Sequence, residues 1–223
     1  MRNEAQEWVL RREIVRVAQR LSAKGFFPST SGNLSARLDA DRVLLTPSGV
    51  PKARLHPEEL LVVNLEGEVL QGMRGLRPTS EAPMHLEVYR RRPDVRAVIH
   101  AHPAAAVALT VAGISLEEPV LPEVLLLLGP VPTTAYATPS SEENRTAIAD
   151  LIGDHDVLLL ARHGSLTVGR DLDEAAQRLE VLEHSARTLI WAHLLGEVSP
   201  LSPEALTKLT AVRRAYLQAQ PKA

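Results

Sequence analysis

The sequence contains no cysteine, and this absence excludes several kinds of chemistry at once. A chain without thiols has no disulfide framework, no thiolate zinc site and no thiol nucleophile. Metal binding or acid–base chemistry must therefore use histidine, aspartate, glutamate or tyrosine.

The sequence also lacks an excess of positive charge and any long apolar run. Lysine and arginine together number 25 against 27 acidic residues, a net charge of −2, so neither nucleic acid nor an acidic membrane surface is indicated as a partner. Residues 1–12 are charged throughout, and no apolar run approaches the roughly 18 residues that a membrane span needs. We therefore expect a soluble, cytoplasmic protein that holds a small ligand locally.

What is present is enough for one globular domain over residues 1–223, with 45% hydrophobic residues. The sequence shows no repeat, low-complexity tract or linker, and hairpins beside helices favour an α+β fold over a purely parallel sheet. The prolines and the leucine run in 116–138 leave that segment unassigned. Hydrophobic periodicity and turn residues predict helices at 4–22, 80–92, 103–112, 140–152, 171–195 and 203–218, hairpins at 34–46 and 60–70, and strands at 95–102 and 156–161.

Three of the eight histidines have a spacing that suggests a metal site. His100 and His102 alternate along an expected strand, so their side chains leave the same face about 6.5 to 7 Å apart. His163 follows a second strand, and Gly164 after it allows a sharp turn that delivers a third imidazole. Three histidines with an open position are typical of catalytic zinc, although a strand with two histidines can also be a hydrogen-bonded surface.

Glu81 is the acidic partner that we expect beside these histidines. Thr79 or Ser80 can cap a helix that Pro83 helps to begin, which places Glu81 in its first turn, where the helix dipole favours anions. Ordinary capping explains the same pattern. His85, four residues later, is expected to support or cap this region rather than to bind metal.

Three polar loops, at 29–33, 46–49 and 79–80, have the hydroxyls and backbone amides that surround an oxyanion or a polyol. Each of them is also a good turn former without any ligand. The loops therefore become informative only when they are taken together with the histidines.

The order of these motifs, S-G-N at 31–33, T-P-S-G at 46–49, T-S-E at 79–81, H-A-H-P at 100–103 and R-H-G at 162–164, resembles the class II aldolase and adducin head family. The resemblance covers about residues 5–197 and is nearest to its fuculose phosphate aldolase branch. It implies an α/β/α sandwich with a nine-stranded, mainly antiparallel sheet covered by helices on both faces. It also implies a homotetramer whose active site lies near a subunit interface.

The resemblance further implies a role for individual residues. One zinc ion per subunit would be held by His100, His102 and His163 with Glu81 beside it, and Glu81 would move the proton on the reacting carbon. The phosphate of a small sugar substrate would bind at Gly32, Asn33, Ser48, Gly49, Thr79 and Ser80. The implied reaction is the reversible cleavage of a ketose 1-phosphate to dihydroxyacetone phosphate and an aldehyde.

Two positions depart from this branch and leave the aldehyde half of the substrate open. Glu123 stands about where the family has a tyrosine in the loop after H-A-H-P, and an acid differs from a phenol in charge and in proton-donor strength. Tyr216 is aligned with a second, C-terminal tyrosine, but the last helix has no motif to fix the register.

Other members of the family use the same motifs for different reactions. They include pentulose-5-phosphate 4-epimerases, methylthioribulose-1-phosphate dehydratases and sugar-acid phosphate decarboxylases, and zinc, cobalt and manganese all suit imidazole ligands. A scaffold of the adducin type, or a metal-free phosphosugar-binding protein, is the alternative of another class. Neither needs three histidines and a carboxylate at these positions.

Overall fold

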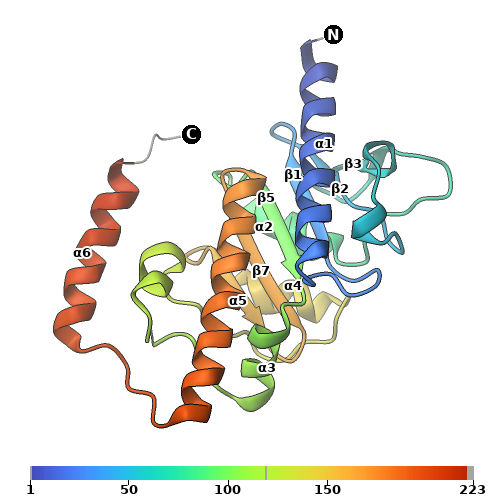
Figure 1. Cartoon of the computed structure of the whole chain (residues 1–223). Coiled ribbons are helices and arrows are strands. Elements are labelled where there is room, and N and C mark those ends of the chain that lie inside the picture. Colours follow the sequence, from blue (N-terminus) through green and yellow to red (C-terminus); the bar gives the residue numbers. More distant parts are fainter. Residues whose placement is uncertain (1, 119, 220–223) are drawn as a thin grey trace.

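A computed structural model describes residues 2–118 and 120–219 of the chain (Figure 1). A π-helical turn, η3, spans Val124–Leu128, and short 3₁₀ turns span Lys52–Arg54 and Pro57–Glu59. The helices are α1 (Arg2–Ala23), α2 (Ala82–Arg91), α3 (Ala104–Ala112), α4 (Glu142–Ala149), α5 (Leu172–Leu195) and α6 (Pro203–Ala219). The strands are β1 (Asn33–Arg37), β2 (Arg42–Leu45), β3 (Leu61–Asn64), β4 (Val69–Gln71), β5 (Ala97–Ala101), β6 (Val157–Leu160) and β7 (Gly164–Gly169).

The strands form one seven-stranded sheet in the order β4-β3-β2-β1-β5-β7-β6, and each adjacent pair is antiparallel. The expected α+β fold is confirmed, but the described residues form seven strands instead of the nine that the resemblance implied. The segment beyond β6 pairs with it in parallel only at an isolated bridge between Thr133 and Leu159. Pro130 and Pro132 both precede Thr133, and proline cannot donate a ladder hydrogen bond.

Helices cover both faces of the sheet, because its strands bury side chains on both sides. Leu34, Ala36, Ala97 and Ile99 pack against α1 and α5 on one face. On the other face the buried residues include Val98 and Leu166, which belong to a cluster with α2 and α4. Successive side chains of a strand point to opposite faces. Because Leu34, Ala36 and Ile99 face α1 and α5, Ser35 and His100 face α2. The layered α/β/α arrangement follows from this alternation.

The predicted helices and hairpins all occur within a few residues of their expected bounds. The prediction missed β7, which begins at Gly164 immediately after His163 and pairs with β5 and β6. The unassigned segment 116–138 contains η3, whose backbone carbonyls at Leu125 and Leu126 accept hydrogen bonds from Arg213 of α6. Tertiary contacts, which local periodicity does not report, determine the structure of both regions.

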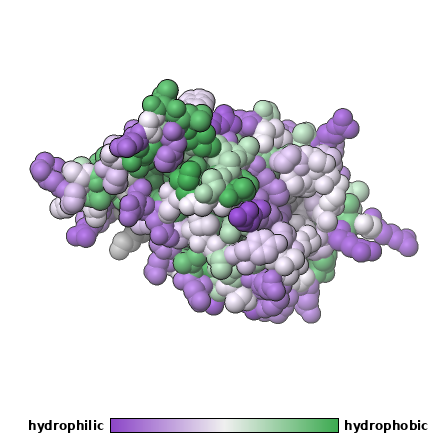
Figure 2. All heavy atoms as spheres, turned by 90° about the horizontal axis from the view of Figure 1, so that it is seen from below, coloured by the Kyte–Doolittle hydropathy of each residue, from purple (hydrophilic) through white to green (hydrophobic). Residues whose placement is uncertain are grey.

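One end of the molecule exposes large hydrophobic side chains. Leu194 and Leu195, at the C-terminal end of α5, are 79% and 89% exposed. That end lies at the bottom of Figure 1, and the view from below shows hydrophobic residues gathered on one side of this face (Figure 2). Within the described residues, no helix is both long enough and apolar enough to span a membrane.

Candidate metal centre and anion loops

The register of the sheet brings the first two polar side chains of the site together. Asn33 of β1 lies directly opposite His100 of β5, and side chains of such a pair stand on the same face of the sheet. Both reach one oxygen of Glu81: Asn33 Nδ2 donates to Glu81 Oε2 at 2.9 Å, and His100 Nε2 lies 3.0 Å from the same oxygen. The pairing of β1 with β5 is therefore what positions Glu81 against His100.

His163 comes from the tight turn between β6 and β7. Its backbone N–H donates to Leu160 O at 3.0 Å, and the left-handed residue of the turn is Arg162, with φ of 58°. The sequence prediction assigned the turn to Gly164, and that explanation is wrong. Gly164 is needed for a different reason: a Cβ atom there would lie 2.5 Å from Ala101 O and 2.9 Å from His100 Cε1.

The three histidines converge as predicted from their spacing. The ring centroids of His100, His102 and His163 are 4.8 to 5.1 Å apart, and one nitrogen from each lies within 4.8 Å of the other two. The Nε2 atoms of His100 and His102 are 3.0 Å apart. Two nitrogens bound to one tetrahedral zinc ion at about 2.0 to 2.1 Å would be about 3.3 Å apart, so His100 and His102 need to move little to share a cation.

Glu81 is the N-cap residue of α2, one position before the first turn in which it was predicted. Its backbone N–H donates to Thr79 Oγ1 at 3.4 Å. Its carboxylate faces the cluster, with Oε1 3.4 Å from His163 Nε2 and Oε2 near His100. Only 7% of the residue is exposed. The expected side-chain cap from Thr79 or Ser80 is absent, since Glu81 itself holds the N-cap position and no side chain caps the helix there. The start of α2 instead directs the Glu81 carboxylate at the histidines.

Electrostatics favour an ionised Glu81 and neutral rings at His102 and His163. Burial alone would raise the pKa of Glu81, but the charge of His100 and hydrogen bonds from His100 and Asn33 lower it below its ordinary value. Burial, with the neighbouring His100 charge, lowers the pKa of His102 to about 4 and also lowers that of His163. At neutral pH these two rings are in the uncharged form that binds metal.

The donor set fits a divalent cation. His100 Nδ1 lies 2.9 Å from Ser165 O, and donation of its N–H to this carbonyl fixes the ring with Nε2 facing Glu81 and the other histidines. A cation bound at Nε2 would take the place of the proton that this nitrogen shares with Glu81. Glu81 Oε1 is buried without a hydrogen-bond partner. Such an orphaned buried acceptor is costly unless something compensates it, and a cation among three imidazole nitrogens would do so.

A buried chain of hydrogen bonds holds Asn33 and Glu81 from behind. Asn33 donates to Glu81 through Nδ2, so its amide oxygen Oδ1 points to His85. This Oδ1 accepts a hydrogen bond from His85 Nε2 at 2.5 Å. His85 is fully buried, which lowers its pKa to about 3, so the ring is neutral and its Nδ1 accepts from Ser35 Oγ at 2.6 Å. Ser35 in turn lies 2.9 Å from Tyr89 Oη. The expected supporting role of His85 is consistent with this chain, whereas Ser35 and Tyr89 were not foreseen.

The three polar loops border the histidine cluster. Gly32 has φ of +68°, and a Cβ there would lie 2.3 Å from the ring of Phe27, so the first loop requires glycine. The second and third loops are joined by an antiparallel bridge between Pro47 and Pro78. Thr79 N–H donates to Thr46 O across this bridge. The loops that contain Asn33, Ser48, Gly49, Thr79 and Ser80 are thus brought together.

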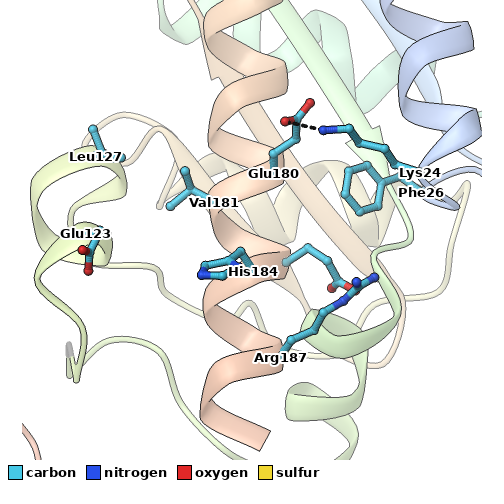
Figure 3. Close-up of a pocket in the computed structure, with 9 residues that line it drawn as sticks. Lys24, Phe26, Glu123, Leu127, Glu180, Val181, His184 and Arg187 are labelled. Atoms are coloured by element: carbon cyan, nitrogen blue, oxygen red, sulfur yellow. Dashed lines mark hydrogen bonds and ion pairs between the residues drawn. The ribbon is translucent and has the colours of Figure 1, made fainter. Parts of the chain in front are cut away.

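Glu123 and Tyr216 lie elsewhere in the chain. Glu123 lines a cavity of about 580 Å³ with Phe26, His184 and other residues on the outer side of α5 (Figure 3). Tyr216 is 52% exposed on α6 and lines a separate small cavity with Leu126 and Leu127. In the part of the chain that the structure describes, no hydrogen bond or ion pair joins either residue to the histidine cluster.

The structure adds two residues that sequence reasoning did not select. Lys52 is only 2% exposed and donates to Thr30 O in the first loop and to Val50 O, just after the second. Ser140, which has φ of 61°, donates to Ser80 Oγ at 2.8 Å. No sequence pattern distinguishes Lys52 from a surface lysine, and Ser140 reaches the site from a segment 60 positions away.

Comparisons with known proteins agree with this geometry. Residues 12–190 match the family described as Class II Aldolase and Adducin N-terminal domain. The chain is 34% identical over 195 residues to 3-oxo-tetronate 4-phosphate decarboxylase of Escherichia coli K12, covering 86% of this chain and 89% of the relative. It is 34% identical over 189 residues to methylthioribulose-1-phosphate dehydratase of Acidiphilium cryptum, covering 77% and 85%. The crystal structure of L-fuculose-1-phosphate aldolase from Thermus thermophilus superposes with a TM-score of 0.73 at 35% identity, covering 86% and 98%.

Proposed function

Because the chain belongs to the class II aldolase and adducin N-terminal domain family, whose enzymes are metal-dependent lyases, we propose that it is a zinc-dependent lyase of a small phosphorylated sugar. The observation that carries the proposal is the meeting of three imidazoles with the orphaned oxygen of Glu81. The first candidate reaction is the reversible cleavage of a ketose 1-phosphate to dihydroxyacetone phosphate and an aldehyde.

His100, His102 and His163 would hold one divalent cation per chain, with Glu81 beside it. A cation there supplies Lewis-acid polarisation of a substrate carbonyl. Glu81 is ionised at neutral pH, because nearby charge and hydrogen bonds lower its pKa, so it can accept a proton at Oε1. Its other oxygen stays anchored by Asn33, which keeps the proton-transferring oxygen in place.

The polar loops would bind the phosphate group. Gly32 and Gly49 offer backbone amides, and Ser48 and Ser80 offer hydroxyls, because the Ser48 amide already donates to Arg77 O. Thr79 connects this group to Glu81 through its hydroxyl. Asn33 carries two amide hydrogens, of which one is given to Glu81. The second remains for the ligand, so Asn33 can link the phosphate loops with the carboxylate.

A decarboxylase acting on a sugar-acid phosphate is the second candidate. The 34% identity to 3-oxo-tetronate 4-phosphate decarboxylase favours it, and so does the absence of a fuculose-type tyrosine at position 123. Cleavage of a carbon–carbon bond beside a polarised carbonyl is common to both reactions. In the decarboxylase the departing carbon dioxide takes the carboxylate away without releasing a proton, so the carbon left behind would gain its proton from water, and Glu81 would relay that proton. Dehydration or epimerisation on the same site would also begin at this carbonyl.

We also propose a homotetramer, as the family resemblance implies. Glu123 and Tyr216 lie away from the histidines of their own chain. If they contact substrate, they do so in the site of another copy. Sedimentation of the purified protein tests the tetramer, and a monomer with full activity would remove both residues from the site.

The decisive test of the role of Glu81 is Glu81→Gln. This variant keeps the side-chain size but cannot accept the proton, and we expect it to retain one zinc ion per chain while turnover falls about 100- to 10,000-fold. Glu58→Gln, at an exposed position, is the matched control and should keep both properties. A Glu81→Gln enzyme with wild-type turnover would eliminate Glu81 as the proton carrier.

A substrate panel distinguishes the candidate reactions. The zinc-loaded protein is incubated with ketose 1-phosphates, pentulose 5-phosphates and a 3-oxo sugar-acid phosphate, while dihydroxyacetone phosphate, carbon dioxide, loss of water and epimers are measured. Release of dihydroxyacetone phosphate identifies an aldolase, and release of carbon dioxide identifies the second candidate. A protein that binds no stoichiometric metal and is unaffected by a chelator would instead be a scaffold or a metal-free binding protein.

A further inference from the structure

A buried lysine that the family motifs do not include lies directly after the second of the loops proposed to bind phosphate. Lys52 begins the 3₁₀ turn that follows the second loop, and only 2% of it is exposed. Its Nζ donates to Thr30 O at 2.8 Å and to Val50 O at 3.1 Å. One ammonium group therefore connects the first loop to the end of the second.

The ammonium group of Lys52 is incompletely paired. Its two partners are neutral carbonyl oxygens, and no ion pair involving Lys52 occurs among the described residues. An ammonium group has three hydrogens, so one remains for another acceptor. A buried charge without a carboxylate partner weakens a fold, and an apolar side chain would fill the same space at lower cost. Stability alone does not account for a lysine here.

The charge of Lys52 also acts on the catalytic centre. The charge of Glu81 favours the charged form of Lys52 and opposes the lowering of the Lys52 pKa by burial. Lys52 therefore contacts the loops and lies within electrostatic range of the carboxylate that faces the histidines. The other groups of these loops that would face a phosphate are neutral amides and hydroxyls, which leaves a dianion without a counter-charge.

We propose that Lys52 is a further substrate-binding residue, whose ammonium group supplies the positive charge for the phosphate and holds the first two loops together around it. This proposal rests on the proposed function, because it requires a phosphorylated ligand at these loops. It predicts selectivity for the phosphate ester over the corresponding alcohol. The cation at the histidines would not provide this selectivity, since it contacts the other end of the ligand.

The test compares two ligands on the zinc-loaded protein by calorimetry: dihydroxyacetone phosphate and dihydroxyacetone. Lys52→Met removes the charge and the hydrogen bonds, while Lys52→Gln removes the charge but keeps an amide donor for the loop carbonyls. We expect both variants to bind dihydroxyacetone phosphate about 10- to 100-fold more weakly and to bind dihydroxyacetone as the wild type does. Lys24→Met, at a half-exposed lysine paired with Glu180, is the matched control and should change neither affinity.

Each outcome has a clear meaning. If the wild type binds dihydroxyacetone phosphate and both folded Lys52 variants bind it equally well, the proposal for Lys52 is wrong and the proposed function stands. Equal weakening of both ligands would show that Lys52 only supports the loops. If the wild type binds neither dihydroxyacetone phosphate nor inorganic phosphate, the phosphosugar function itself is wrong, and the role of Lys52 is overturned with it. Thermal melts establish which variants are folded, and Lys52→Gln decides the question if Lys52→Met is not.

Discussion

Replacing Gly164 with alanine should damage the metal centre without altering any ligand. The alanine Cβ would lie 2.5 Å from Ala101 O, 2.9 Å from His100 Cε1 and 3.1 Å from His102 Cδ2. Unstrained contacts between carbon atoms are about 3.5 to 4.0 Å, so the strand or the rings must move by roughly 1 Å. Metal–ligand distances tolerate only about 0.2 Å. We therefore expect zinc affinity to fall about 10- to 100-fold and the metal-free protein to lose about 1 to 3 kcal/mol of stability.

Zinc titration against a competing chelator measures the affinity of the Gly164→Ala variant, and urea unfolding of the metal-free protein measures its stability. Gly153→Ala is the matched control, because a Cβ there meets no atom within 4 Å. It should stay within about 0.5 kcal/mol of the wild type and bind zinc normally. Wild-type zinc affinity in Gly164→Ala would refute the inferred packing of β7 against the two histidines.

Three further predictions concern stability. Chelation of the metal should lower the free energy of unfolding by about 2.7 kcal/mol when zinc was present at about 100 times its dissociation constant; an unchanged melting temperature after complete removal would contradict a metal bound to the folded state. His85→Leu should cost at least about 2 kcal/mol in urea unfolding, because Asn33 Oδ1 loses its partner and Ser35 Oγ keeps only Tyr89. A variant as stable as the wild type would show that the buried chain contributes nothing. Burial lowers the pKa of Lys52 to about 8, below the unfolded value of about 10.4, so the unfolded chain holds this proton more tightly. The free energy of unfolding of the wild type, relative to that of Lys52→Met, should therefore rise between about pH 8 and pH 10, by at most about 1.4 kcal/mol per pH unit. If the two free energies differ by the same amount throughout that range, Lys52 is not a buried charged group.

The part of the site that sequence could predict is the part that local spacing determines. His100 and His102 alternate on one strand, so their common face was predictable from period two alone. Glu81 was predictable because helix-start residues surround it. In both cases the relevant geometry extends over only a few residues.

The rest of the site depends on contacts between distant segments. That Asn33 lies opposite His100 is a matter of strand register, and β7 is recognisable only when β5 and β6 pair with it. Lys52 resembles a surface lysine until its loop folds over it. The buried hydrogen-bond chain joins two alternate residues of β1 to three residues spaced one helical turn apart, from the start of α2 onward: Asn33 and Ser35, with Glu81, His85 and Tyr89. Neither set makes these hydrogen bonds until the strand and the helix pack together.

The central claim is that His100, His102 and His163 share one divalent cation beside Glu81. Metal content, measured by mass spectrometry after zinc loading and exhaustive dialysis, tests it most directly. The account predicts one zinc ion per chain in the wild type and almost none in a folded His102→Ala, His163→Ala double variant. A wild type without stoichiometric metal, or a double variant that keeps its full zinc content, would contradict the account.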